Sequence, residues 1–107
     1  MHPGFLIPSH RYLYPDLSLQ ELREEIGAVD QDIMELISRR MDIALRIAES
    51  KSETGLPTRD PERVEEVLSA VSRQAVSLGL DPVPVRDIFA LLIRMSEDLQ
   101  DRKRGMV

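Results

Sequence analysis

The sequence has few of the residue types on which many enzymes depend. It contains no cysteine, which excludes disulfides, thiolate metal ligands and a cysteine nucleophile within these 107 residues. Its two histidines, His2 and His10, both lie near the N-terminus, so we expect neither a histidine metal site nor a Ser-His-Asp triad. With two tyrosines, two phenylalanines and no tryptophan, the core must consist mainly of aliphatic side chains.

The chain also lacks an excess of positive charge and any long apolar run. Its net charge is −5, and we expect no nucleic-acid partner, because neutralising phosphates requires a cationic surface. No apolar run approaches the roughly 18 residues that a membrane span requires. The N-terminus does not have the pattern of a signal peptide. These absences predict a cytoplasmic protein that does not contact a membrane.

The remaining pattern predicts an N-terminal arm followed by one helical domain. Residues 1–17 contain three prolines and one glycine without helical periodicity, which predicts an extended arm. Residues 18–107 show a helical period and no strand pattern, which predicts an all-α fold. Residues with a high N-cap preference mark the starts of three helices, at Ser18, Asp60 and Asp81. The helices are expected to end near Glu53 and just before Gly79 and Gly105.

The first predicted helix is unusually long for a chain of this size. It runs from Leu19 to about Glu53 without a proline, or about 50 Å at 1.5 Å per residue. A compact domain of this length has a radius of gyration of roughly 13 Å, so two shorter helices cannot cover the whole rod. We therefore predict an intertwined homodimer in which the long helices pack together. The alternative is a helix broken near Gly27, which would allow a monomer.

Several polar residues lie on helix faces that are expected to be buried. Arg40 and Lys51 lie on the apolar stripe of the first helix, and Arg23 lies on its flank. The other two helices place further polar residues at such positions, namely Arg63, Ser96 and Gln100. A buried, unpaired charge is very costly, and the acids of the first helix project elsewhere. We therefore expect a pocket for a small, doubly negative ligand, with no acids matching its cations. The alternative is that each cation reaches water or a neighbouring acid.

The order and spacing of these residues are also those of a known family. The dipeptide "LR" ends at Arg23, "RR" ends seventeen residues later at Arg40, and Lys51 follows after eleven more. "RDPER" then spans residues 59–63, before "LGLDP" and "IFALLIRMSEDLQ". From residue 19 to about residue 100, the sequence resembles the all-helical chorismate mutases. The resemblance implies a three-helix protomer in an intertwined homodimer, with two active sites that both chains build.

This resemblance also implies a role for each candidate residue. Arg23 would reach into the partner's site, whereas Arg40 and Lys51 would lie in the same-chain site. The other substrate-binding positions that it implies are Asp60, Arg63, Val64, Ser96 and Gln100.

The implied reaction is the Claisen rearrangement of chorismate to prephenate, a step of phenylalanine and tyrosine biosynthesis. It is pericyclic and intramolecular, so it requires no nucleophile, metal or other cofactor. The arginines would clamp the two carboxylates of the substrate. Lys51 and Gln100 would donate to the ether oxygen, where negative charge develops, and Asp60 would hold the ring hydroxyl.

Val64 departs from the family pattern and leaves two other functions open. Many members have a glutamate here, directly after Arg63, which accepts a hydrogen bond from the substrate hydroxyl. "PERV" and "RRMD" are also similar to the isochorismate-pyruvate lyases of salicylate biosynthesis, which share the fold. The loop "LPTRDPER" keeps the mutase length and Asp60, which favours the mutase. A third possibility is a non-catalytic helical module that regulates a partner enzyme of the shikimate pathway.

Overall fold

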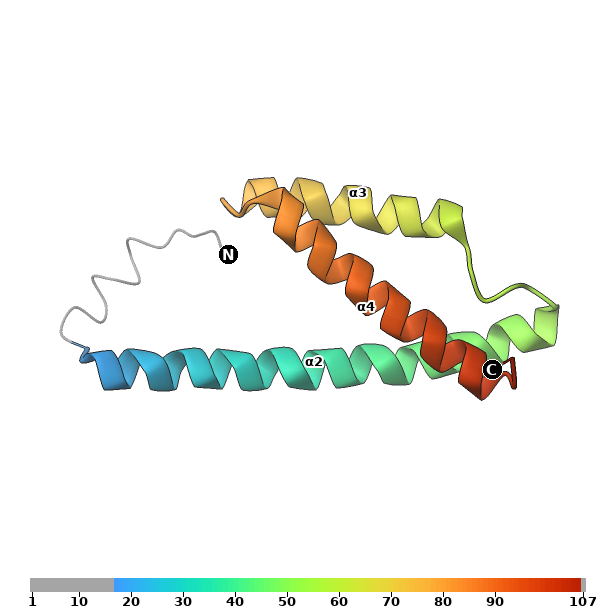
Figure 1. Ribbon diagram of the computed structural model, residues 1–107, viewed down its shortest axis with the longest axis horizontal. Coiled ribbons are helices and arrows are strands. Elements are labelled where there is room, and N and C mark those ends of the chain that lie inside the picture. The colour runs from blue at the N-terminus through green and yellow to red at the C-terminus, as the bar shows by residue number, and fades with distance from the viewer. Residues whose placement is uncertain (1–16, 107) are drawn as a thin grey trace.

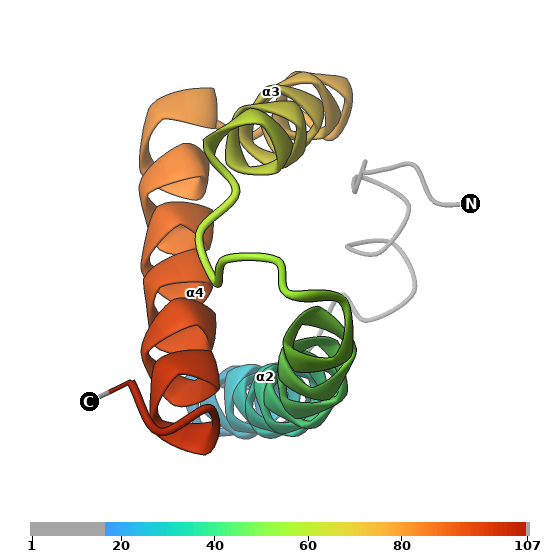
Figure 2. The same cartoon turned by 90° about the vertical axis from the view of Figure 1, so that its right-hand side faces the viewer.

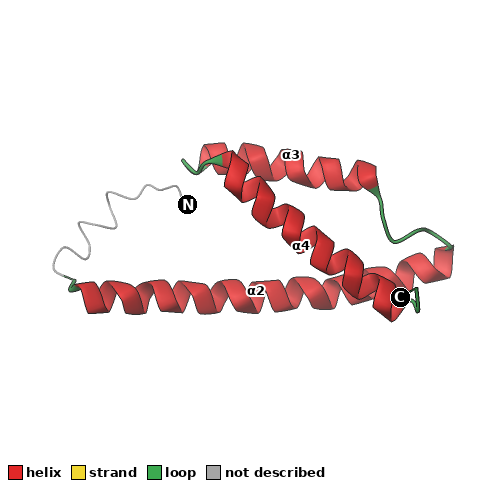
Figure 3. Ribbon diagram, viewed as in Figure 1, coloured by secondary structure: helices red, strands yellow, loops and turns green. Residues whose placement is uncertain are grey.

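All the regular structure in the computed structural model, which describes residues 17–106, is helical (Figures 1 and 3). The helices are α2 (Leu19–Thr54), α3 (Pro61–Ser77) and α4 (Pro82–Lys103), and no strand occurs between residues 17 and 106. The predicted all-α fold with one long first helix is confirmed. The predicted arm lies outside the described residues, apart from Leu17. Within the described part of the chain, no helix is long and apolar enough to cross a bilayer.

The helix ends are set by local hydrogen bonds that the sequence predicted. The Ser18 hydroxyl accepts from the Glu21 backbone N–H at 3.1 Å, and the Glu21 carboxylate accepts from the Ser18 N–H at 2.9 Å. These two bonds form a capping box. The hydrogen bond from the Ser18 N–H to the Glu21 carboxylate is the main cause that lowers the pKa of Glu21. Asp60 and Asp81 cap α3 and α4 through their side-chain oxygens. Three glycines beyond the helix ends adopt the left-handed conformation: Gly55, Gly79 and Gly105.

The helix α4 packs against both of the other helices, whereas α2 and α3 do not contact each other. Figure 2 shows α4 along one side of the molecule, bridging α2 and α3, so that a space faced by all three helices lies beside it. The hydrophobic core of the single chain is small. Its buried apolar residues are Ala44, Ala48, Leu68, Val71 and Ala75.

The helix α2 extends far beyond the part of the chain that covers it. The molecule measures 56 × 26 × 21 Å, and its radius of gyration is 17.8 Å, well above the roughly 13 Å of a compact domain of this length. The helix is continuous through Gly27, so the alternative of a broken helix is wrong. Its buried residues, Ala44 and Ala48, both lie in the C-terminal half. The N-terminal half exposes a row of large apolar side chains: Leu22, Ile26, Val29, Ile33 and Leu36.

Candidate active site

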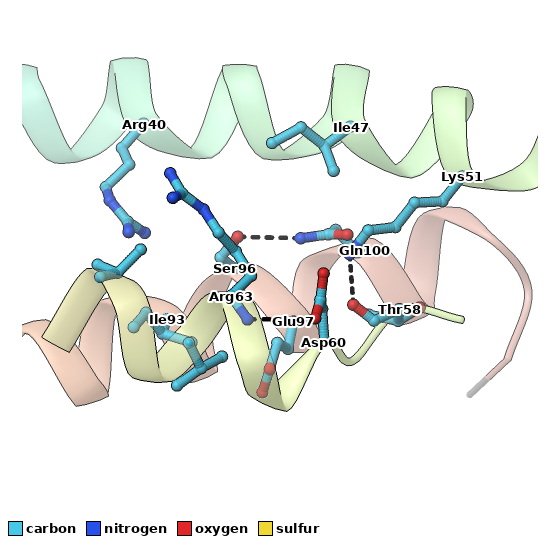
Figure 4. Close-up of a pocket in the computed structure, with 12 residues that line it drawn as sticks. Arg40, Ile47, Lys51, Thr58, Asp60, Arg63, Ile93, Ser96, Glu97 and Gln100 are labelled. Atoms are coloured by element: carbon cyan, nitrogen blue, oxygen red, sulfur yellow. Dashed lines mark hydrogen bonds between the residues drawn. The ribbon is translucent and has the colours of Figure 1, made fainter. Parts of the chain in front are cut away.

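The candidate residues from the three helices gather around one cavity. It has a volume of about 240 Å³ and lies between α2, the loop before α3, α3 itself and α4 (Figure 4). Seven of the eight residues predicted to form the site line it: Arg40, Lys51, Asp60, Arg63, Val64, Ser96 and Gln100. Helical projection placed five of these residues on inward faces, and the family resemblance implied the other two, Asp60 and Val64. The fold brings all seven together.

Arg40 and Lys51 extend from α2 across the cavity (Figure 4), and backbone carbonyls hold both of them. The Arg40 guanidinium donates to the Leu92 carbonyl at 3.4 Å, and the Lys51 ammonium donates to the Thr58 carbonyl. Both residues are half-buried. Neither forms an ion pair with a carboxylate in the described part of the chain. Two half-buried positive charges therefore face the cavity without a neutralising partner, an arrangement that favours an anionic ligand.

Arg63 differs from these two cations because it does have an acidic partner. Its guanidinium lies 3.2 Å from the Glu66 carboxylate one turn along α3, and its side chain is 68% exposed. The expectation that the inward cations have no matching acids is therefore wrong for Arg63. An exposed pair of this kind contributes only about 0.2–1 kcal/mol, because water competes for both charges. Arg63 can therefore leave Glu66 for an anion in the cavity at little cost.

Gln100 and Ser96 form the neutral polar wall on α4. Gln100 is 4% exposed, and its Nε2 donates to the Ser96 hydroxyl at 3.1 Å. Its Oε1 is buried and has no hydrogen-bond partner within residues 17–106, which is costly for a buried amide. Turning the amide by 180° would keep the bond to Ser96, because a hydroxyl both donates and accepts. The amide N–H group would then take the unpartnered position, ready to donate to a bound ligand.

Two further polar residues line the cavity that the sequence analysis did not identify, beside the apolar Ile47, Val67 and Ile93. Thr58 is 5% exposed, and its carbonyl holds Lys51. It lies in the loop between two helices, where periodicity gives no information on side-chain direction. Glu97 lies next to Ser96 on α4. It follows Ile93 by four residues and precedes Gln100 by three, so helical spacing could have found it.

Arg23 is the one candidate residue that the fold does not bring to the cavity. It lies in the exposed N-terminal half of α2, seventeen residues before Arg40. At 1.5 Å per residue, this separation is roughly 25 Å along the helix. Its side chain cannot span that distance, so it cannot act in the cavity of its own chain.

The sequence matches a known family over most of the residues that the structure describes. Residues 22–101 match the family described as chorismate mutase type II. The chain belongs to this family. The resemblance predicted from the motifs is therefore confirmed, and with it the assignment to an enzyme family of isomerases.

Three curated proteins illustrate the relationship. The chain is 36% identical over 75 residues to a 4-amino-4-deoxychorismate mutase of Streptomyces venezuelae, covering 70% of this chain and 73% of that protein. It is 32% identical to a chorismate mutase of Methanocaldococcus jannaschii, covering 77% and 83%. It is 31% identical to a T-protein of Enterobacter agglomerans over 79% of this chain, but spans only 23% of that protein.

A solved structure is also similar to this chain. It is a conserved hypothetical protein from Pyrococcus furiosus, which is 34% identical and superposes with a TM-score of 0.62. The match covers 79% of this chain and 97% of that protein. The likeness in structure and the likeness in sequence therefore extend over most of the described helices.

Proposed function

We propose that this chain catalyses the rearrangement of chorismate to prephenate as a chorismate mutase. The observation that supports this most strongly is the pair of unneutralised cations, Arg40 and Lys51, at a cavity that also holds Gln100. Chorismate is a small dianion with two carboxylates and an ether oxygen. Its size suits a cavity of about 240 Å³, and its charge matches the cations that line it.

In this proposal the chain acts through conformation and electrostatics alone. Arg40 and Arg63 bind the carboxylates, so that the enolpyruvyl group lies over the ring in the reactive geometry. A carbon–carbon bond forms between the enolpyruvyl methylene and the ring while the ether carbon–oxygen bond breaks. Lys51 and Gln100 donate to the ether oxygen, where negative charge grows, and thereby stabilise the transition state. No proton is transferred and no other reactant is consumed.

A second copy of the chain completes the site. The exposed apolar rows of two α2 helices pack against each other, one from each subunit. The two chains thereby form an intertwined homodimer. Burial of a large aliphatic side chain contributes about 1.5–3 kcal/mol, and the row contains five of them. Arg23, which cannot reach its own cavity, then enters the cavity of the partner subunit and adds a third guanidinium for the substrate carboxylates.

A 4-amino-4-deoxychorismate is a second candidate substrate, favoured by the acids of the cavity. Asp60 and Glu97 both line it, and Val64 stands where many members of the family have a glutamate. An amino group at the ring position carries more hydrogens than a hydroxyl and accepts a proton, so it pairs well with carboxylates. A relative 36% identical to the chain is named for this substrate.

A product assay separates these substrates from the lyase and from the non-catalytic module. The purified chain is offered chorismate, 4-amino-4-deoxychorismate and isochorismate in separate reactions. Formation of prephenate from chorismate supports the chorismate mutase. Faster conversion of 4-amino-4-deoxychorismate than of chorismate supports the second candidate. Formation of salicylate and pyruvate from isochorismate would contradict both mutase candidates and support the lyase. If none of the three substrates gave a product, the non-catalytic regulatory module would be the remaining function.

The cellular setting is also part of this proposal. We place the chain in the cytoplasm, with aromatic amino acid biosynthesis as its pathway. A partner enzyme of the shikimate pathway fits this setting, because several relatives are longer proteins that the chain spans only in part. One of them is a bifunctional chorismate mutase/prephenate dehydratase of Aquifex aeolicus, of which the chain covers 15%.

A further inference from the structure

Arg104, the residue that follows α4, ties the end of the chain to α2 and to the loop before α3. Its side chain donates three hydrogen bonds, one to α2 and two to that loop. The acceptors are the Ser52 hydroxyl at 3.1 Å, the Thr58 hydroxyl at 2.9 Å and the Leu56 carbonyl at 2.6 Å. One rigid guanidinium therefore fixes three points of a segment about fifty residues earlier in the sequence.

Thr58 is the point at which this network reaches the cavity. The residue is 5% exposed, its hydroxyl lies against Arg104, and its backbone carbonyl accepts from the Lys51 ammonium. The position of the Lys51 ammonium in the empty cavity therefore depends on the position of the Thr58 backbone. Because the other residues of the loop 55–60 are exposed, the loop has little packing of its own to hold that backbone in place.

A second side chain from the end of α4 supports the same loop. The Asp101 carboxylate lies 2.6 Å from the Arg59 guanidinium, and the residue is 8% exposed. Hydrogen bonds from Arg59 and from the Thr58 hydroxyl lower the pKa of Asp101. Two residues near the end of α4 thus hold two consecutive residues of the loop, and the loop leads directly into the cap of α3 at Asp60.

We propose that Arg104 is a positioning residue for the reaction: by holding Thr58 and Leu56 it places the Lys51 ammonium for the developing charge on the ether oxygen. This inference rests on the proposed function. Arg104 itself does not line the cavity, so it acts through the loop. Loss of this support lets the ammonium move, and a displacement of about 1 Å can lower a rate by roughly 100-fold.

The decisive experiment compares R104A with R104K and with a matched control, K103A. Lys103 lies in the same turn, and its ion pair is with Glu49 of α2 at 3.8 Å rather than with the loop. We expect R104A to lower kcat roughly 10-fold to 100-fold, with KM changed less than about threefold, because the carboxylate clamp remains. R104K should lie between R104A and the unaltered chain, and K103A should stay within about twofold of the latter. Equal effects of R104A and K103A would overturn the inference.

A second variant keeps the inference testable if R104A does not fold. T58V removes the hydroxyl that Arg104 holds but keeps the backbone carbonyl and the side-chain volume. We expect a lower kcat with little change in KM, as for R104A. Turnover by T58V at the rate of the unaltered chain would overturn the inference.

Amide hydrogen exchange distinguishes failure of this inference from failure of the proposed function. In the ligand-free chain, R104A should speed exchange in residues 55–60, where the Leu56 N–H bonds to the Lys51 carbonyl, while α3 keeps its protection. Unchanged exchange in residues 55–60 would overturn the inference even if activity fell. A chain that exchanges as expected but converts none of the three substrates would refute the proposed function and leave the hydrogen-bonded support of the loop established.

Discussion

The two halves of α2 use the same stripe of the helix in different ways. In the C-terminal half the stripe carries two buried small residues, Ala44 and Ala48, beside Ile47, which is 42% exposed and lines the cavity. The cations Arg40 and Lys51 lie on that stretch too and face the cavity. In the N-terminal half the stripe carries Leu and Ile, and those side chains remain 44–63% exposed. Small residues permit close approach within the chain, whereas large exposed ones require a cover from outside it.

This difference supports the proposed homodimer, in which one helix serves two subunits. The cations of α2 that face the cavity, Arg40 and Lys51, lie where the chain's own α3 and α4 are close enough to complete it. The N-terminal half instead offers apolar surface and one cation, Arg23, too distant for its own cavity. Two results would contradict this division of roles in α2. One is that the apolar half is unimportant for activity, and the other is that the cations of the packed half are only surface charges.

The largest effect is expected from a charge in the middle of the apolar half. Ile33→Asp should convert a dimer of about twice the 12.2 kDa chain mass into a monomer, because dimerisation would bury two carboxylates. Activity should fall at least ~1000-fold, since each cavity loses its second wall and Arg23 of the partner subunit. Sedimentation and kcat/KM are measured on the same preparation.

Ala28→Asp provides the control, because Ala28 is exposed and lies away from the apolar row. It adds the same charge to the same helix and should leave the dimer and the activity unchanged. A monomeric but fully active Ile33→Asp variant would show that the site needs only one chain.

The next largest effect is expected from the cations of the packed half. Arg40→Ala and Lys51→Ala should each lower kcat/KM by at least ~100-fold, or about 2.7 kcal/mol, while helicity and dimerisation persist. Circular dichroism and sedimentation verify the last two. Activity within a few-fold of the unaltered chain would mean that the altered residue is an ordinary surface cation.

Mixed dimers test whether Arg23 acts in the cavity of the partner subunit. Arg23→Ala chains combined with Lys51→Ala chains should regain activity, because in a heterodimer both lesions fall in one cavity and the other is intact. Mixing two preparations of the same variant should regain none. Failure to regain activity in verified heterodimers would place Arg23 outside the site.

The local features of α2 could be predicted from the sequence, and so could most of the cavity. The capping box at Ser18 follows from chemistry within four residues, and Arg40, Lys51 and Gln100 follow from helical periodicity. The role of Arg104 could not be predicted, because it depends on contacts with residues 46–52 positions earlier. The pairing of Arg63 with Glu66 was missed, although the two lie three residues apart on α3, a spacing at which helical side chains meet.

A smaller effect is expected near the start of α3, where Val64 lines the cavity that the packed half of α2 also lines. In a mutase, Val64→Glu restores an acceptor for the substrate hydroxyl, which should tighten chorismate binding about threefold to tenfold. Some stability should be lost, because a carboxylate enters a half-buried position. Steady-state kinetics with chorismate and a thermal melt measure the two effects.

Val64→Gln serves as the control for charge, since the amide accepts a hydrogen bond without a negative charge. In a lyase, Val64→Glu should instead depress pyruvate release from isochorismate. A fall in both reactions with the fold intact would mean that Val64 packs in the core and that the hydroxyl is held elsewhere.

The smallest effect is expected at Asp101, which helps to join the end of α4 to the loop that follows α2. Its pKa is lowered from 3.8, mainly by the hydrogen bond from Arg59, so the folded chain binds this proton less readily than the unfolded chain. The carboxylate therefore stabilises the fold above pH 3.8, and this contribution is lost as the pH falls through the lower pKa of the folded chain. Asp101→Asn should lower Tm at pH 7, and the Tm difference between this variant and the unaltered chain should shrink as the pH falls below 3.8.

Asp98→Asn is the matched control, because Asp98 lies 3.9 Å from the same guanidinium and its side chain is 54% exposed. The Tm of this variant should therefore fall less. A Tm difference for Asp101→Asn that stays constant with pH would show that the carboxylate charge does not stabilise this junction.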